Sequence, residues 1–199
     1  MQIILASSSP YRRKVFAKLG FPFKVIPSDL DENRIKKTAK EPKELVVRLA
    51  LEKARTVVGL LKKRGVKEFL VIGADSTAAK KEKGKWIFLD KPKNKQEAKK
   101  MALFLKGKRH KFYTGLAAIN SEDEQRAAIC TSDVYFKNFS DKVLEKFLKS
   151  GIWEGRAGGY DIKDDKSQLI EKYKGSYTNI LGLPLEIVKE FLIDFGISL

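Results

Sequence analysis

The sequence predicts an α/β fold with a mixed twisted sheet and flanking helices. Two patterns favour this class. Apolar runs of strand length alternate with stretches that carry apolar residues at helical spacing, and two consecutive strand-length runs are joined by a short polar turn. The chain has 199 residues, 43% of them hydrophobic, which suffices for a core and indicates one domain over residues 1–199. A glycine-rich stretch at 151–159 is a candidate boundary of a second lobe.

In the first half of the chain, cap residues locate the elements. Residues 2–6 form a short apolar strand, after which Ser9 caps a helix that has Pro10 at its first position and Gly20 as its stop. The elements expected next are a strand at 23–26, an acidic turn at 28–32, a helix at 42–63 and a strand at 69–72 that ends at residues 73–75.

The second half alternates in the same way. Gly107 ends one helix, Ser140 caps another, and the last helix begins at Pro184 and carries one apolar face. The elements expected here are strands at 86–89, 110–119 and 127–136, the last two as an antiparallel pair, and helices at 94–105, 140–149 and from 184 onward.

Composition excludes several classes of protein. No apolar run approaches the roughly 20 residues that span a bilayer, so no membrane association is expected. A single Cys and a single His exclude an internal disulfide and a Cys/His zinc site, and we expect a reducing, cytoplasmic location. The P-loop and G-x-G-x-x-G patterns of the standard nucleotide folds are also missing from the sequence.

The net charge of +16 has two interpretations. A basic surface often binds nucleic acid, whereas a high content of Lys and Glu is also typical of a heat-adapted, solvated surface. The segment 80–111 holds 13 of the basic residues against three acids, so a polyanion would be drawn there first.

Two cations lie where a helix normally favours anions. Arg12 and Arg13 occupy the first turn after Pro10, close to the positive end of the helix dipole. A strand, a Ser-rich turn and a helix start together offer backbone N–H groups and hydroxyls that suit phosphate. Either an anion binds there or both side chains point into water.

A lysine interrupts an apolar helix face. Val46, Ala50, Lys53 and Val57 share one face of the helix at 42–63. Burying an unpaired ammonium group is costly, so Lys53 either extends to the surface or enters a cleft to meet phosphate or carboxylate.

An acid follows the most apolar strand. The apolar run at 69–72 is ended by Gly73, Ala74 and Asp75, and ligands of open α/β sheets gather at the carboxyl ends of strands. Asp75 therefore either caps the next segment or, with an acid of the turn at 28–32, holds Mg²⁺, which prefers carboxylate and phosphate oxygens.

Seven motifs in one consistent order resemble the Maf family of nucleotide pyrophosphatases across nearly the whole chain. They are residues 5–13 (LASSSPYRR), 49–54 (LALEKA), 73–76 (GADS), 90–92 (DKP), 110–115 (HKFYTG), 157–160 (AGGY) and 175–184 (GSYTNILGLP). The resemblance implies two lobes around a central cleft, as in inosine triphosphatases. It also implies metal-dependent hydrolysis of the α–β bond of a nucleoside triphosphate, and makes a homodimer plausible.

The resemblance also implies roles for individual residues. Asp75 and Glu32 would be the catalytic acids and the ligands of a divalent metal, Mg²⁺ or Mn²⁺. The residues expected to bind the substrate phosphates are Ser7, Arg12, Arg13, Lys53 and Lys91.

The base-binding region departs from one part of the family. Members acting on thymidine and uridine triphosphates commonly have Pro-Arg-Arg, and Gly-Ile-Gln after the AGxY loop. Here Tyr11 follows Pro10, and residues 161–163 read Asp-Ile-Lys, so the preferred base stays open. The aromatic residue before Arg-Arg is closer to the subgroup acting on methylated guanosine, uridine and cytidine triphosphates. The residues assigned to this region are Tyr11, Thr77, Tyr160 and Lys163.

Two other functions remain alternatives. A nucleic-acid-binding module would use the basic segment 80–111, although nucleic acid is the less favoured partner. A nucleotide sensor would bind a triphosphate without hydrolysing it.

Overall fold

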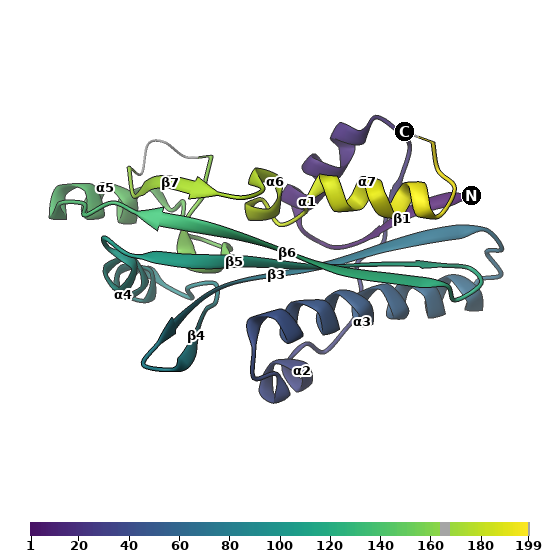
Figure 1. The fold of residues 1–199 in the computed structure, drawn as a ribbon, viewed down its shortest axis with the longest axis horizontal. Helices are drawn as coiled ribbons and strands as arrows, with labels where there is room; N and C mark the ends of the chain where they lie inside the picture. Colours follow the sequence, from purple (N-terminus) through teal and green to yellow (C-terminus); the bar gives the residue numbers. More distant parts are fainter. Residues whose placement is uncertain (164–167, 199) are drawn as a thin grey trace.

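The computed structural model describes residues 1–163 and 168–198, which form one mixed seven-stranded sheet with helices on both faces (Figure 1). The order is β2-β1-β3-β5-β6-β7, with β4 pairing with β3. The strands are β1 (Gln2–Ala6), β2 (Lys24–Val25), β3 (Phe69–Glu82), β4 (Lys85–Leu89), β5 (Arg109–Asn120), β6 (Gln125–Phe136) and β7 (Ile170–Lys174). β1 runs parallel to β2 and β3, and the other pairs are antiparallel. The predicted fold class is confirmed.

The helices begin where the cap residues predict. Ser9 accepts a hydrogen bond from the backbone N–H of Arg12, and Ser140 does the same for Val143. The helices are α1 (Pro10–Phe16), α2 (Asn33–Thr38), α3 (Pro42–Lys63), α4 (Lys95–Leu105), α5 (Asp141–Ser150), α6 (Tyr177–Ile180) and α7 (Leu185–Asp194).

The long strands divide the core between two faces, because neighbouring side chains of a strand point to opposite sides. Leu70, Ile72 and Ala74 pack toward α1 and α7, and Phe69 and Val71 pack toward α3. Figure 1 shows α7 and α3 on opposite sides of these strands.

One prediction about the strands is wrong. Asp75 does not end the strand at 69–72, because β3 continues to Glu82 and Asp75 lies near its middle. The ladder between β3 and β5 runs past Asp75, which pairs with Gly115, and long-range pairing overrides the local turn signal of Gly73. The short elements α2, β7 and α6 were not predicted, since four to six residues give little periodicity.

Two glycines let α3 lie unusually close to the sheet. A Cβ atom at Gly73 would lie 2.2 Å from the carbonyl oxygen of Ala50, and one at Gly115 would lie 2.3 Å from that of Val46. Neither position therefore has room for a side chain. This close packing carries Lys53 of α3 to the level of Asp75 on β3.

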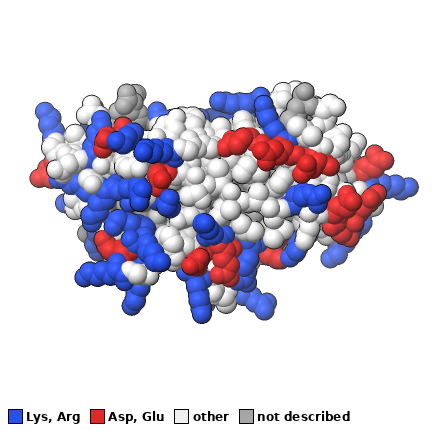
Figure 2. Space-filling view, viewed as in Figure 1, with Lys and Arg blue, Asp and Glu red and all other residues white. Residues whose placement is uncertain are grey.

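The other end of the sheet has its own hydrophobic cluster, which joins α4 and α5 to β3, β5 and β6. Lys and Arg side chains are dense over this end in Figure 2. The organisation into one domain with two lobes stays a prediction. Across residues 1–163 and 168–198, no helix combines the length and apolar composition that crossing a bilayer requires.

Candidate functional site

A gap in the sheet explains why distant segments meet. β1 ends at Ala6, opposite Gly73 of β3, and the pairing of β4 with β3 begins only at Ala78, opposite Leu89. The chain therefore leaves β1 at Ser7 and leaves β4 toward Lys91 at the same edge of β3. A large cavity of about 620 Å³ opens there, and Ser7 and Lys91 both line it.

Three predicted residues meet in this large cavity. Nζ of Lys53 lies 2.6 Å from Oδ1 of Asp75 and 2.7 Å from Oε1 of Glu32. The side chains of Lys53 and Asp75 are only 11% and 12% exposed. Lys53 thus enters a cleft and meets carboxylates, one of its two predicted alternatives. Of the acidic turn at 28–32, Ser28 and Glu32 line the cavity, whereas Asp29 and Asp31 are exposed.

The electrostatics of this cluster keep the carboxylate of Glu32 charged. Burial alone would raise the pKa of Glu32, but hydrogen bonds and charges from Lys36 and Lys53 outweigh it and lower that pKa to about 2. Lys36, which no sequence pattern singled out, lies 2.7 Å from Oε2 of Glu32. It comes from α2, the short helix that was also missed.

Arg12 approaches from the opposite face of β3. Its Nε donates to the carbonyl oxygen of Gly182 at 2.8 Å, and its Nη2 donates to Oγ of Ser76 at 2.9 Å. Burial lowers the pKa of Arg12, and the charges of Asp75 and Glu32 oppose that shift.

The two arginines of the first helix turn separate. Arg12 lines the large cavity, whereas Arg13 is exposed and lies outside the lining that the described residues form. The structure therefore does not bring Arg13 to the other predicted phosphate ligands, and its predicted role remains without support.

A small cavity of about 130 Å³ adjoins the large one and shares Tyr11, Arg12, Ser76 and Lys91 with it. Of the residues assigned to the base region, Tyr11 and Tyr160 line the small cavity and Thr77 lines the large one. Lys163 is exposed and lines neither.

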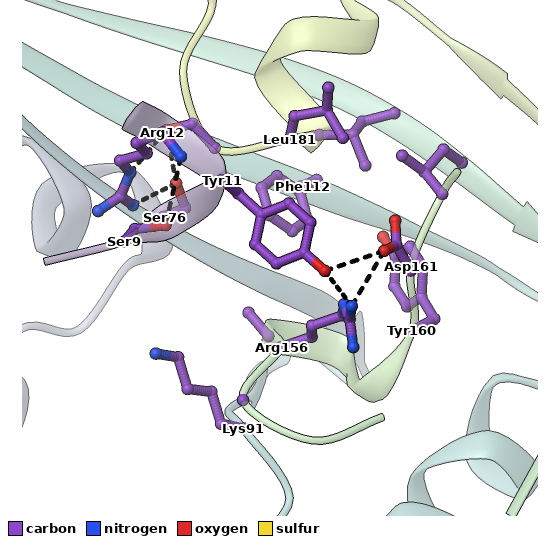
Figure 3. A pocket seen from close by; sticks show the side chains of 15 residues that line it. Ser9, Tyr11, Arg12, Ser76, Lys91, Phe112, Arg156, Tyr160, Asp161 and Leu181 are labelled. Carbon is purple, nitrogen blue, oxygen red and sulfur yellow. Dashed lines mark hydrogen bonds and ion pairs between the residues drawn. The ribbon is translucent and has the colours of Figure 1, made fainter. Parts of the chain in front are cut away.

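Two residues of the small cavity escaped the sequence analysis as candidates for a site. Nη2 of Arg156 lies 3.1 Å from Oδ2 of Asp161, and the two residues flank the loop that carries Tyr160 (Figure 3). The position of Arg156 next to the AGGY motif was the available signal. His110 is buried, and its Nε2 lies 2.9 Å from the hydroxyl of Tyr160. Burial lowers the pKa of His110 to about 3.

The carboxylates suit a metal that also binds phosphate. Lys53 contacts Oδ1 of Asp75, and within the described residues Oδ2 has no hydrogen-bond partner. The same part of the chain contains no group of three or more His, Cys, Asp or Glu side chains able to hold a metal. The two carboxylates, those of Asp75 and Glu32, fit Mg²⁺ or Mn²⁺. Mg²⁺ is usually bound by one or two carboxylates together with substrate phosphates.

The fold and the site place this chain in a broad class, the α/β proteins that have carboxylates and cations around one cleft at the edge of the sheet. The solved structure of the Staphylococcus aureus Ham1 protein has a similar fold, with a TM-score of 0.51, and the match covers 98% of this chain and all of that chain. At 14% identity, this likeness shows the fold alone.

Sequence similarity then identifies the family. The profile described as Maf-like protein matches residues 2–195, and the chain belongs to this family. The dTTP/UTP pyrophosphatase of Desulforamulus reducens is 35% identical over 198 residues, which cover 99% of this chain and 98% of the relative. That of Thermotoga maritima is 35% identical over 196 residues, covering 98% and 90%. The predicted family is confirmed.

Proposed function

We infer that this chain is a nucleoside triphosphate pyrophosphatase, which hydrolyses the α–β phosphate bond to release nucleoside monophosphate and pyrophosphate. The observation that carries the proposal is the meeting of Asp75, Glu32 and Lys53 in a large cavity that Arg12 and Lys91 also line. The full-length relatives named dTTP/UTP pyrophosphatase support it.

In the proposed mechanism, the phosphate chain lies in the large cavity. Phosphoryl transfer depends on positioning and on neutralising charge more than on covalent chemistry. Arg12 and Lys91 bind the phosphates, and the hydroxyl and backbone around Ser7 add donors at the start of α1. Asp75 orients the water that attacks the α-phosphorus and accepts its proton, while pyrophosphate leaves on the opposite side.

Asp75 and Glu32 would also hold a divalent metal, Mg²⁺ or Mn²⁺. When bound together with the substrate, the metal neutralises phosphate charge. Lys53 holds the carboxylate of Asp75 in place before substrate arrives. A homodimer, a cytoplasmic location and the physiological metal remain predictions.

The test is an analysis of products with a panel of triphosphates and Mg²⁺ or Mn²⁺. Monophosphate and pyrophosphate are expected, and orthophosphate without pyrophosphate would refute the proposed bond. Asp75→Asn should lower kcat by about 10²–10⁴-fold while leaving the fold intact, because the base is lost. The matched control is Asp123→Asn, which removes an exposed carboxylate and should leave kcat unchanged.

The alternatives give different results. A nucleic-acid-binding module using the basic segment 80–111 would show binding that weakens steeply with salt and no turnover. A sensor would bind triphosphates in calorimetry without turnover. The family membership favours neither alternative.

A further inference from the structure

The small cavity has an apolar floor beside one polar cluster. It adjoins the large cavity at Arg12 and Ser76, and Ile180 of α6 lines it. The apolar residues that line it include Phe112, Ile162, Ile180 and Leu181. A cavity on the order of 150 Å³ holds one benzene-sized ring, so the volume of about 130 Å³ suits a single six-membered ring.

The polar cluster joins three residues from two segments. Tyr11 comes from α1, and Arg156 and Asp161 flank the turn at Ala157–Gly159. The Tyr11 hydroxyl donates to Oδ2 of Asp161 at 3.3 Å and accepts from Nη2 of Arg156. The guanidinium also lies 5.1 Å from the centre of the Tyr11 ring. Figure 3 shows the three side chains converging at one wall of the cavity.

The donors of Arg156 are largely used within the protein. Nη1 donates to the carbonyl oxygens of Ile152 and Glu154, and Nη2 is shared between Tyr11 and Asp161. Its Nε has no partner among residues 1–163 and 168–198, but it is shielded from solvent. Arg156 therefore offers a ligand little beyond its present contacts.

Asp161 keeps accepting capacity. Its Oδ2 accepts from Tyr11 and Arg156, and its Oδ1 accepts from the backbone N–H of Lys163 at 2.9 Å. A carboxylate has about four acceptor positions, so one remains within the described part of the chain. The cluster thus presents an acceptor to the cavity.

We propose, on the basis of the pyrophosphatase function above, that the small cavity holds a pyrimidine base and that Asp161 selects an exocyclic amino group. Cytosine carries an amino donor where uracil and thymine carry a carbonyl acceptor, and Asp or Glu is the side chain that accepts from this amino group. A carbonyl oxygen facing Asp161 is repelled and leaves the carboxylate unpaired. Asp161 is therefore a specificity-determining residue that favours CTP over UTP and dTTP.

The test measures binding and turnover separately. Affinities for CTP, UTP, dTTP and GTP are measured by calorimetry without metal, and kcat/KM is measured for the same nucleotides. We expect the unaltered protein to bind CTP more tightly than UTP. Asp161→Asn should reduce the ratio of CTP to UTP affinity at least about tenfold, because a charge-assisted hydrogen bond is replaced by an amide that can donate to the carbonyl.

Two further variants keep the test decisive. Tyr11→Phe retains the carboxylate and should retain the preference for CTP, and Asp123→Asn makes the same charge change at an exposed turn and should leave the ratio unchanged. An affinity ratio within twofold of the original in Asp161→Asn, or tightest binding of GTP, would overturn the proposal. Selective binding without any turnover would instead overturn the pyrophosphatase function and leave the assignment of Asp161 supported.

Discussion

Replacing Lys53 by Met tests whether opposite charges hold the centre of the site together. Met has similar length, so the change removes the ammonium group and keeps most of the packing of α3 against the sheet. Asp75 then loses the cation 2.6 Å from its Oδ1, whereas Glu32 keeps Lys36 at 2.7 Å. Most of the unbalanced charge therefore falls on Asp75.

The expected loss in the free energy of unfolding is about 3–5 kcal/mol, the usual effect of removing one partner from a buried ion pair. The value for a buried ion pair applies here, because the side chains of Lys53 and Asp75 are only 11% and 12% exposed. The double variant Lys53→Met/Asp75→Asn no longer carries the unpaired carboxylate, so it should recover at least half of that loss.

Urea unfolding at pH 7, followed by circular dichroism, measures these differences. The control is Lys62→Met, because Lys62 and Asp123 also lie 2.6 Å apart but are 40% and 70% exposed. Such an exposed pair contributes at most about 1 kcal/mol. The reasoning fails if Lys53→Met costs no more than Lys62→Met, or if the double variant is no more stable than Lys53→Met alone.

Three predictions concern the fold itself. Gly115→Ala should unfold the protein or destabilise it by several kcal/mol, about the cost of severe overpacking, since the added Cβ would lie 2.3 Å from the Val46 carbonyl oxygen. Gly59→Ala, in open space on α3, should instead stabilise by about 0.5–1 kcal/mol in the same urea assay. The free energy of unfolding should also fall from pH 6.5 to pH 5 by up to about 1.4 kcal/mol per pH unit. His110 takes up a proton in the unfolded chain near pH 6.5, whereas burial lowers its folded pKa to about 3. An equal slope in His110→Gln would contradict this cause.

Local signals in the sequence were sufficient to predict most of the fold. Helix starts at Ser9, Pro42 and Ser140 were predictable because capping depends on residues within one turn. The length of β3 was not predictable, because its second half pairs with β5, which lies far along the chain, as well as with β4, which follows directly after β3. Strand propensity depends on such partners more than helix propensity does.

The expectation of a ligand site at Asp75 depended on a strand end that the structure does not have. We expected ligands at its position because β3 was predicted to end there. The strand that actually ends at this edge is β1, whose last residue pairs with Gly73. The rule that ligands gather at the carboxyl ends of parallel strands therefore applies to the end of β1, and Asp75 lies beside that end.

The individual site residues followed from conflicts between residue type and position. Lys53 on an apolar face and Arg12 at a helix start are both unfavourable unless a partner compensates them. Arg156 shows no such conflict in the sequence, since a polar residue in a glycine-rich loop is ordinary, and Asp161 was noted only as part of the departure at 161–163. Only the fold reveals that they share one wall of a cavity with Tyr11.

The cations that line the large cavity differ in the groups with which they are already paired. Lys53 already contacts two carboxylates, so it can turn to a phosphate only by giving up one of them. Within the described part of the chain, Arg12 donates hydrogen bonds to neutral oxygens, and Lys91 is an exposed lysine without an ion pair. In the proposed mechanism, the attraction for a triphosphate therefore depends mainly on Arg12 and Lys91, which approach β3 from α1 and from the end of β4. Lys53 keeps the two acids together between them, which is what a site that must attract polyphosphate and still hold a carboxylate beside it requires.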